Sequence, residues 1–177
     1  HGRSFHSYEF SYSHMSADIE EYIKYYDLQN PMLLGHSLGG KVAMHLCFRN
    51  PKLYSKLIVI DIAPKKYSID FHKNILEVLN NLSLQDYSSR TEIDNELSVE
   101  INDFAIRQFL MKNLYRDEKK EFKWRFNILT LKEKLDNISE IDFSNIQIDI
   151  PTLFLKGELS NYIVDDDKQI ILSFFFK

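Results

Sequence analysis

The chain has 177 residues, of which 44% are hydrophobic and 27% are charged, and its formal net charge at pH 7 is −4. This length and composition predict about one soluble globular domain, and the weak, interspersed negative charge argues against a nucleic-acid or membrane partner. Cys47 is the single cysteine; it excludes an internal disulfide and favours a reducing, cytoplasmic location. The chain contains no apolar run of about 18 residues and no recognisable signal peptide.

The first third of the chain predicts a helix, a strand, a second helix and a second strand. Ser13 is the candidate N-cap of the first helix, and Pro51 ends the second because the residue before a proline disfavours helical backbone. The second strand is a continuous β-branched run without alternation, which is typical of a strand buried on both faces of a parallel sheet. Strand, helix and strand joined by short links form a βαβ unit. These elements are expected at residues 15–26, 32–35, 38–48 and 57–62.

After Pro64 the pattern becomes helical, with no convincing sheet strand and one short extended piece at residues 122–128. An insertion between two parallel strands is where a lid over an active site would lie. We therefore predict one partial α/β domain over residues 1–177, with a helical lid inserted at residues 65–145. Three aromatic residues of the insertion are candidates for an acyl pocket, although aromatic stripes more often pack in a core: Phe104, Phe109 and Trp124.

The last predicted strand covers residues 152–156 and begins after Pro151. A helix is expected at residues 164–176, and the three aspartates at 165–167 would be favourable at its N-terminus. Three of the four prolines border predicted strands. The fold class predicted from this pattern is α/β with a parallel sheet of about three strands.

One stretch carries a catalytic pattern. A short apolar strand, Gly-x-Ser-x-Gly at residues 35–39 and a helix follow one another, which is the order of a nucleophile elbow. Gly35 and Gly39 would leave room for the turn and for the helix behind it. The Ser37 hydroxyl would stand clear of the sheet, and the Leu38 N–H at the helix N-terminus would stabilise an oxyanion. Alternatively, the turn binds a phosphate or only packs, although no nucleotide-binding glycine motif is present.

A serine nucleophile needs a base to accept its proton and a carboxylate to orient that base. Asp61 lies near the carboxyl end of the strand that follows the Ser37 helix. Ser37 and Asp61 would therefore share the crevice above the carboxyl ends of the strands. From spacing alone, Asp61 could equally be a turn or cap residue before Pro64.

Several motifs together resemble the YbfF-type esterases and the related mitochondrial abhydrolase-domain-eleven proteins of the α/β-hydrolase superfamily. The resemblance covers essentially the whole chain and implies an α/β-hydrolase fold, with Ser37 as nucleophile and Asp61 as catalytic acid. It also places Ser160 where many α/β-hydrolases carry the acid, and Glu158 is the fallback acid. The motifs are His-Gly-Arg-Ser at 1–4, Gly-His-Ser-Leu-Gly-Gly-Lys-Val-Ala-Met at 35–44, Val-Ile-Asp-Ile-Ala-Pro at 59–64, Trp-Arg-Phe-Asn at 124–127 and residues 157–163.

The resemblance implies a histidine base after the final strand, in the chain order Ser, Asp, His. All six histidines lie at or before position 72. The His36 side chain diverges from its neighbour Ser37, His45 lies about two turns along the helix, and His72 falls in the predicted lid without an orienting partner. The earlier strands and the His-Gly oxyanion loop of such proteins also have no counterpart. The chain is therefore expected to be a central fragment with both ends cut.

The expected function is hydrolysis of a small-molecule acyl ester or thioester through a Ser-His-Asp triad, without a metal or organic cofactor. Because the histidine is absent from the chain, we expect negligible turnover by these 177 residues alone. Two alternatives remain at this point. One is a carbon–carbon bond hydrolase with the same triad, and the other is an inactive hydrolase-like binding or scaffold module.

Overall fold

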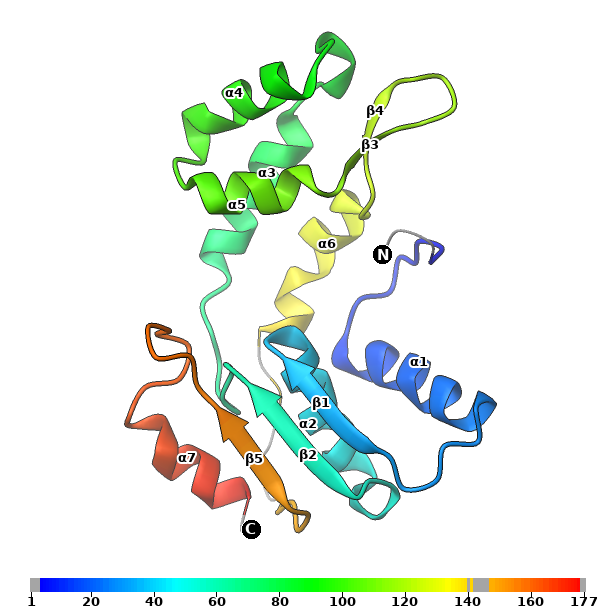
Figure 1. The fold of residues 1–177 in the computed structure, drawn as a ribbon, viewed down its shortest axis with the longest axis vertical. Coiled ribbons are helices and arrows are strands. Elements are labelled where there is room, and N and C mark those ends of the chain that lie inside the picture. The colour runs from blue at the N-terminus through cyan, green and yellow to red at the C-terminus, as the bar shows by residue number, and fades with distance from the viewer. Residues whose placement is uncertain (1–3, 140, 142–146, 176–177) are drawn as a thin grey trace. The chain divides into compact units, whose positions relative to one another are not determined.

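The structure is a computed structural model that describes residues 4–139, 141 and 147–175. The chain divides into two compact units, which are described separately. The unit called the sheet unit comprises residues 11–67 and the described part of 137–175. The unit called the helical unit comprises residues 4–10 and 68–136. Figure 1 shows the sheet unit in blue, cyan and orange to red, and the helical unit mainly in green and yellow.

Three parallel strands form the sheet of the sheet unit, in the order β1-β2-β5. Gly35 lies opposite Val59, and Val59 lies opposite Phe154, so the three carboxyl ends reach the same edge (Figure 1). This sheet confirms the predicted βαβ unit and the predicted partial α/β-hydrolase fold with three strands. The strands and the helix between the first two are β1 (Met32–His36), α2 (Leu38–Arg49), β2 (Lys56–Ile60) and β5 (Thr152–Leu155).

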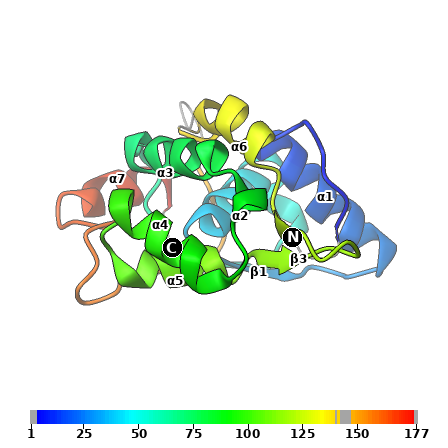
Figure 2. The ribbon, with the colours of Figure 1, turned by 90° about the horizontal axis from the view of Figure 1, so that it is seen from above.

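One face of this sheet carries the core. Leu57 and Val59 are fully buried there, together with residues of three helices that lie on the same side of the sheet (Figure 2). On the opposite face Leu34 is 63% exposed and Leu155 is 44% exposed. The prediction that the 57–62 run is buried on both faces is therefore wrong, because no described helix covers the second face. The three helices are α1 (Tyr12–Tyr25), α2 and α7 (Asp167–Phe174).

The boundaries of two sheet-unit helices differ from the prediction. Helix α1 begins at Tyr12, and its N-cap is Ser11, whose hydroxyl accepts from the His14 N–H at 3.3 Å. Ser13 is therefore not the cap, because the buried Tyr12 side chain extends the apolar face toward the N-terminus. Helix α7 is shorter than predicted, and residue 176 of the predicted helix lies outside the described residues. Pro51 begins a short 3-10 helix, η1 (Pro51–Leu53), as α2 ends.

The helical unit has a core of its own. Ile93 and Leu97 are fully buried in it, together with Leu79 and Phe122. This confirms the predicted helical character of the segment after Pro64, whereas its role as a lid and the 65–145 boundaries stay predictions. Its helices are α3 (Asp70–Asn81), α4 (Arg90–Glu100), α5 (Phe104–Met111) and α6 (Ile128–Lys134). The 3-10 turn η2 (Leu84–Asp86) lies between α3 and α4, and η3 (Leu135–Ile138) follows α6 where the chain passes into the sheet unit.

The helical unit also contains a small hairpin, of which the sequence pattern predicted only the second strand, within the extended piece at residues 122–128. Strand β3 (Leu114–Arg116) pairs with β4 (Phe122–Trp124) in antiparallel register. Helix α5 ends at Met111, three residues before the first strand of this hairpin. The turn is held by Asp117, whose Oδ1 accepts from the backbone N–H groups of Lys119 and Glu121 at 2.9 and 3.0 Å. Strands of three residues are too short to show a clear alternation.

Candidate active site

Ser37 sits at the junction of β1 and α2 in a strained backbone conformation. Its φ is 52° and its ψ is −120°, a combination that non-glycine residues rarely adopt. The Ser37 N–H donates to the Ile60 carbonyl at 3.0 Å, and its own carbonyl accepts from the Lys41 N–H at 3.1 Å. These two bonds fix the residue between the sheet and the first turn of α2. Such strain is typical of a functional turn, and the local geometry agrees with the predicted elbow.

Two glycines allow the helix to pass this close to the strand. A Cβ on Gly35 would lie 2.2 Å from the Gly39 carbonyl oxygen, and a Cβ on Gly40 would lie 2.7 Å from Cγ2 of Ile62. A Cβ on Gly39 would meet no atom within 4 Å. The prediction assigned this packing role to Gly35 and Gly39. It is wrong for Gly39, whose missing side chain faces open space, and Gly40 takes that role.

The start of α2 presents unused hydrogen-bond donors. The Ser37 side chain makes no capping bond, and within the described chain neither its hydroxyl nor the Leu38 N–H has a hydrogen-bond partner. The first N–H groups of a helix have no intrahelical acceptor, and they form the positive end of the helix dipole. The Leu38 N–H therefore lies next to the Ser37 hydroxyl in a position suited to bind an anionic oxygen.

Asp61 occupies the equivalent position on the neighbouring strand. His36 lies opposite Ile60, so the residues that follow them, Ser37 and Asp61, leave the sheet at the same edge. Asp61 also has a left-handed backbone, with φ at 57°, and its N–H donates to the Leu155 carbonyl at 2.8 Å. This reversal of the chain explains why β2 ends at Ile60 rather than at the predicted residue 62.

The loop after β5 is hydrogen-bonded to the Asp61 carboxylate. The Ser160 hydroxyl donates to Asp61 Oδ2 at 2.7 Å, and the Gly157 N–H donates to Oδ1 at 3.3 Å. The structure thus brings together Asp61 and Ser160, two of the predicted site residues, and both carboxylate oxygens are oriented. Glu158, the fallback acid, is exposed on the same loop.

The described histidines of the sheet unit do not provide a base beside Ser37. The His45 Nδ1 is hydrogen-bonded to the Ser16 hydroxyl at 2.8 Å, and its ring stacks on Phe48. Burial chiefly lowers the pKa of His45; the positive charge of Arg49 lowers it further, while Glu20 raises it. This placement agrees with the prediction that His45 points away from the turn.

The other described histidines are either exposed or hydrogen-bonded to residues outside the Ser37 turn. His36 ends β1 with an exposed side chain, and His14 is hydrogen-bonded to the Ser11 hydroxyl. His72 lies in the helical unit, where it is exposed beside Phe71. His6 of the same unit is bonded to the Arg125 carbonyl, and His1 lies outside the described residues.

Sequence reasoning missed two residues that lie next to this site. Tyr67 follows the Asp61 segment and is bonded through its hydroxyl to Ala63 and Tyr162. Lys41, in the first turns of α2, is only 4% exposed although it carries a charge. The only sequence signal was the position of Lys41 within the elbow segment. The burial of Lys41 and the hydrogen bonds of Tyr67 cannot be predicted from spacing.

Cys47 lies in the core of the sheet unit. It is fully buried in the core on α2, on one side of the helix with Ala43 and Leu46. Burial raises the pKa of its thiol to about 12. A protonated, inaccessible thiol is a poor nucleophile, so Cys47 is a core residue and does not compete with Ser37.

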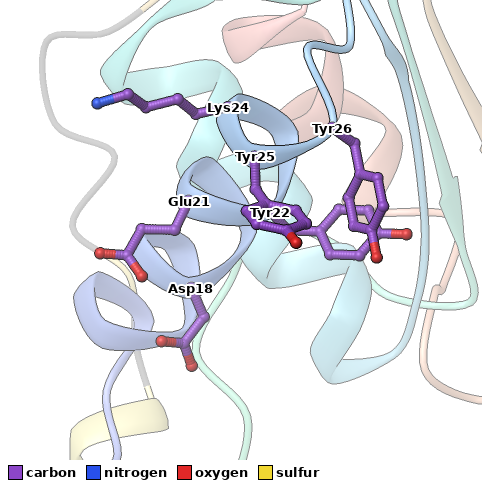
Figure 3. Close-up of a pocket in the computed structure, with 6 residues that line it drawn as sticks. All are labelled: Asp18, Glu21, Tyr22, Lys24, Tyr25 and Tyr26. Carbon is purple, nitrogen blue, oxygen red and sulfur yellow. The ribbon is translucent and has the colours of Figure 1, made fainter.

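A hollow on the sheet unit lies away from these residues. It occupies the second half of α1, where Figure 3 shows three tyrosine side chains gathered on one side and Lys24 pointing away from them. Tyr26 precedes the loop into β1, so the hollow belongs to the amino end of that strand, whereas Ser37 lies at its carboxyl end. The residues that line it are Asp18, Glu21, Tyr22, Lys24, Tyr25 and Tyr26.

The acyl-pocket candidates all belong to the helical unit. Phe104 and Phe109 are exposed on α5, and Trp124 packs against the core of that unit. Among the residues that the structure describes, no group of three or more His, Cys, Asp or Glu side chains could hold a metal ion. No described helix is long and apolar enough to cross a membrane.

Comparison with known proteins shows that the chain is similar to esterases and to a lipase. A marine microorganism esterase of known structure matches with a TM-score of 0.92 and 39% identity, covering 99% of this chain and 69% of the esterase. The sn-1-specific diacylglycerol lipase ABHD11 of Mus musculus is 33% identical over 168 residues, which are 92% of this chain and 54% of the lipase. Esterase YbfF of Escherichia coli is 28% identical over 176 residues, covering 99% of this chain and 66% of YbfF.

These relatives are longer than the chain, which spans 54% of the mouse lipase and 66% of the bacterial esterase. No protein-family model matches the chain. The identity of 39% to the marine esterase extends over nearly the whole chain and over 69% of that protein, with the same backbone course. The chain therefore belongs to the esterases of the α/β-hydrolase superfamily.

Proposed function

We propose that the chain carries the nucleophile and the acid of a serine hydrolase that cleaves acyl esters or thioesters. The observation that carries the proposal is the pairing of two strained turns at one edge of the sheet. Ser37 and Asp61 both have positive φ and follow paired strand residues. Family membership supports the same chemistry, because the relatives above are described as esterases and a lipase.

In this proposal the Ser37 Oγ attacks the acyl carbonyl carbon while its proton passes to a histidine base. The tetrahedral oxyanion accepts a hydrogen bond from the Leu38 N–H. Collapse releases the alcohol or thiol, which takes the proton from the base, and leaves an acyl-serine. Water then attacks this ester through the same base and regenerates Ser37. The described histidines of the sheet unit do not occupy the position of that base.

Asp61 would orient the histidine and stabilise its charged form. Its carboxylate already accepts bonds from Ser160 and Gly157 at 2.7 and 3.3 Å. These bonds hold the carboxylate in one orientation. Ser160 therefore supports the acid as a secondary member of the site and does not replace it.

The substrate of this site would be a small acyl ester or thioester, and the mechanism requires no metal or organic cofactor. We assign the helical unit the role of a lid that encloses the acyl group. A cytoplasmic location fits the reduced, buried Cys47.

The test is covalent labelling of the 177-residue chain with a fluorophosphonate probe, with peptide mapping of the modified serine. We expect slow labelling at Ser37 alone, and at least about tenfold faster labelling when free imidazole supplies a base. Ser37→Ala should abolish the signal in both conditions, which also controls for catalysis by imidazole itself. Labelling at another serine, or none even with imidazole, would contradict the proposal. In that case the binding or scaffold module would be the better interpretation.

Rapid Ser37-dependent labelling without imidazole would leave the hydrolase proposal standing. It would contradict only the expectation that this chain lacks its base. A carbon–carbon bond hydrolase uses the same nucleophile, so the distinction depends on substrate. Hydrolysis of short p-nitrophenyl esters by the imidazole-supplemented chain, absent in Ser37→Ala, would favour ester cleavage.

A further inference from the structure

The hydroxyl of Tyr67 links two loops that meet at Asp61. It accepts from the Ala63 N–H at 2.9 Å and donates to the Tyr162 carbonyl at 2.6 Å. Ala63 lies two residues after Asp61, and Tyr162 lies two residues after Ser160. Burial raises the pKa of Tyr67 to about 12, so the hydroxyl keeps the proton that it donates at neutral pH.

Three hydrogen bonds, joined through the backbone of Tyr162, connect Tyr67 to the Asp61 carboxylate. The Tyr162 N–H donates to the Ser160 hydroxyl at 3.2 Å, and that hydroxyl donates to Asp61 Oδ2 at 2.7 Å. The Tyr67 and Tyr162 rings also contact each other, with centroids 5.8 Å apart. Five of the six residues of the 157–162 loop are exposed, and Ser160 is half-buried. The Tyr67 hydroxyl is therefore well placed to hold the loop.

Tyr67 is itself held by two lysines. The buried Lys41 Nζ lies 4.9 Å from the ring centroid of Tyr67 and donates to the Lys65 carbonyl at 2.9 Å. The Lys65 Nζ lies 5.1 Å from the same centroid and pairs with the buried Asp167 at 2.6 Å. Because a buried ammonium over an aromatic face is attractive, these contacts fix the ring relative to α2, the helix that Ser37 begins.

We propose that Tyr67 is a positioning residue, whose hydroxyl holds the Gly157–Tyr162 loop so that Ser160 and Gly157 keep their hydrogen bonds to Asp61. Only the importance of Asp61 as an acid rests on the function proposed above. Removing the hydroxyl leaves the Tyr162 carbonyl and the Ala63 N–H without that partner. The loop then loosens, and the bonds to the carboxylate weaken with it.

The test compares Tyr67→Phe with the unmodified 177-residue chain by amide proton NMR. We expect hydrogen exchange at Gly157 and Tyr162 to become about tenfold faster, because each loses part of its hydrogen-bonded protection. Exchange at Asp61, whose N–H donates to Leu155 in the sheet, should stay within about twofold. Gly157 also offers a spectroscopic signature. Its amide proton chemical shift reports the hydrogen bond to Asp61 Oδ1, and this shift should move upfield in Tyr67→Phe as that bond weakens.

Tyr54→Phe is the matched control. The Tyr54 hydroxyl is buried without a hydrogen-bond partner among the described residues, in the same unit. Its removal should leave exchange at Gly157 and Tyr162 unchanged. Unchanged exchange at both amides in Tyr67→Phe would overturn the proposal. Equal acceleration at Asp61 would also overturn it, because that would indicate general loosening.

A second variant keeps the proposal testable if Tyr67→Phe does not fold. Ser160→Ala removes the acceptor of the Tyr162 N–H at the other end of the path. Exchange should then rise about tenfold at Tyr162 and severalfold at Ala63, since Ala63 is connected to this loop through the Tyr67 hydroxyl. No change at Ala63 would refute the link. These readouts do not depend on turnover, so they can fail or succeed independently of the hydrolase proposal.

Discussion

Ser89 and Ser37 each precede a helix, and the two serines do opposite things. Ser89 precedes α4 with φ −135° and ψ 156°, and its hydroxyl accepts from the Glu92 N–H at 3.2 Å. Ser37 precedes α2 with φ 52° and ψ −120° and makes no capping bond. Ser89 uses its hydroxyl to satisfy the helix end, as serine commonly does. Ser37 leaves both its hydroxyl and the helix N–H groups available.

The difference comes from what precedes each serine. Ser89 lies in the short connection between η2 and α4, two residues after the extended Tyr87, and its backbone adopts the usual N-cap geometry. Ser37 follows β1 directly, and α2 must turn back against the same strand, where Gly35 and Gly40 permit close contact. Ser37 therefore has a strained backbone and makes no capping bond. Such a strained turn is typical of a nucleophile elbow, whereas a stabilising cap does not require it.

The largest expected effect separates reactivity from stability at Ser37. In the presence of imidazole, Ser37→Ala should lower probe labelling by at least about 10³-fold. Since the hydroxyl caps nothing, the free energy of unfolding should change by less than about 0.5 kcal/mol. Parallel labelling and urea denaturation measure both quantities. A large loss of stability would show that the hydroxyl has a structural role like that of Ser89.

The glycines of the elbow should differ sharply. Gly35→Ala places a Cβ 2.2 Å from the Gly39 carbonyl and should destabilise the sheet unit by about 3 kcal/mol. Gly39→Ala is the control, because its Cβ would lie in open space on a helix. It should be neutral or stabilise by up to about 1 kcal/mol. A comparable loss of stability in both variants would mean that the position within the motif, rather than packing, determines the destabilisation.

The cap at Ser89 should have a moderate effect confined to the helical unit. Ser89→Ala should lower the stability of that unit by about 1 kcal/mol, because the Glu92 N–H loses its acceptor. Hydrogen exchange at Ile93 and Leu97 would report the change, with Leu57 as the reference in the sheet unit. If Ser89→Ala and Ser37→Ala were equally destabilising, the contrast between the two serines would fail.

The smallest effect concerns pH and the helix that Ser37 begins. Burial lowers the pKa of His45 in the folded state, so the unfolded chain binds a proton more readily. The stability contributed by neutral His45 is therefore present above the unfolded pKa of about 6.5 and is lost as pH falls below it. Urea midpoints of the sheet unit should decrease from pH 7 to pH 5, and less so in His45→Gln. An unchanged slope would exclude His45 as the source.

The local pattern of the sequence was enough to identify the elements around the site. The continuous apolar runs, the prolines and the elbow glycines predicted β1, α2, β2 and β5, because backbone preferences act over a few residues. The pattern did not predict the first strand of the hairpin or the cap at Ser11, since each depends on one or two side chains. The covered face of the sheet could not be distinguished from the open one, because Leu57 and Leu34 are equally apolar and differ only in what packs on them.

By itself, the sequence determined the parallel α/β architecture, the tight turn at Ser37 and the candidacy of Ser37 and Asp61 as site residues at the ends of neighbouring strands. Only the tertiary structure decided that Ser160 bonds the Asp61 carboxylate and that Gly40, not Gly39, permits the close approach of helix and strand. It also revealed that Tyr67 joins the two loops at Asp61. These contacts join residues about 100 positions apart or depend on fractions of an ångström, and local preferences carry no information on either.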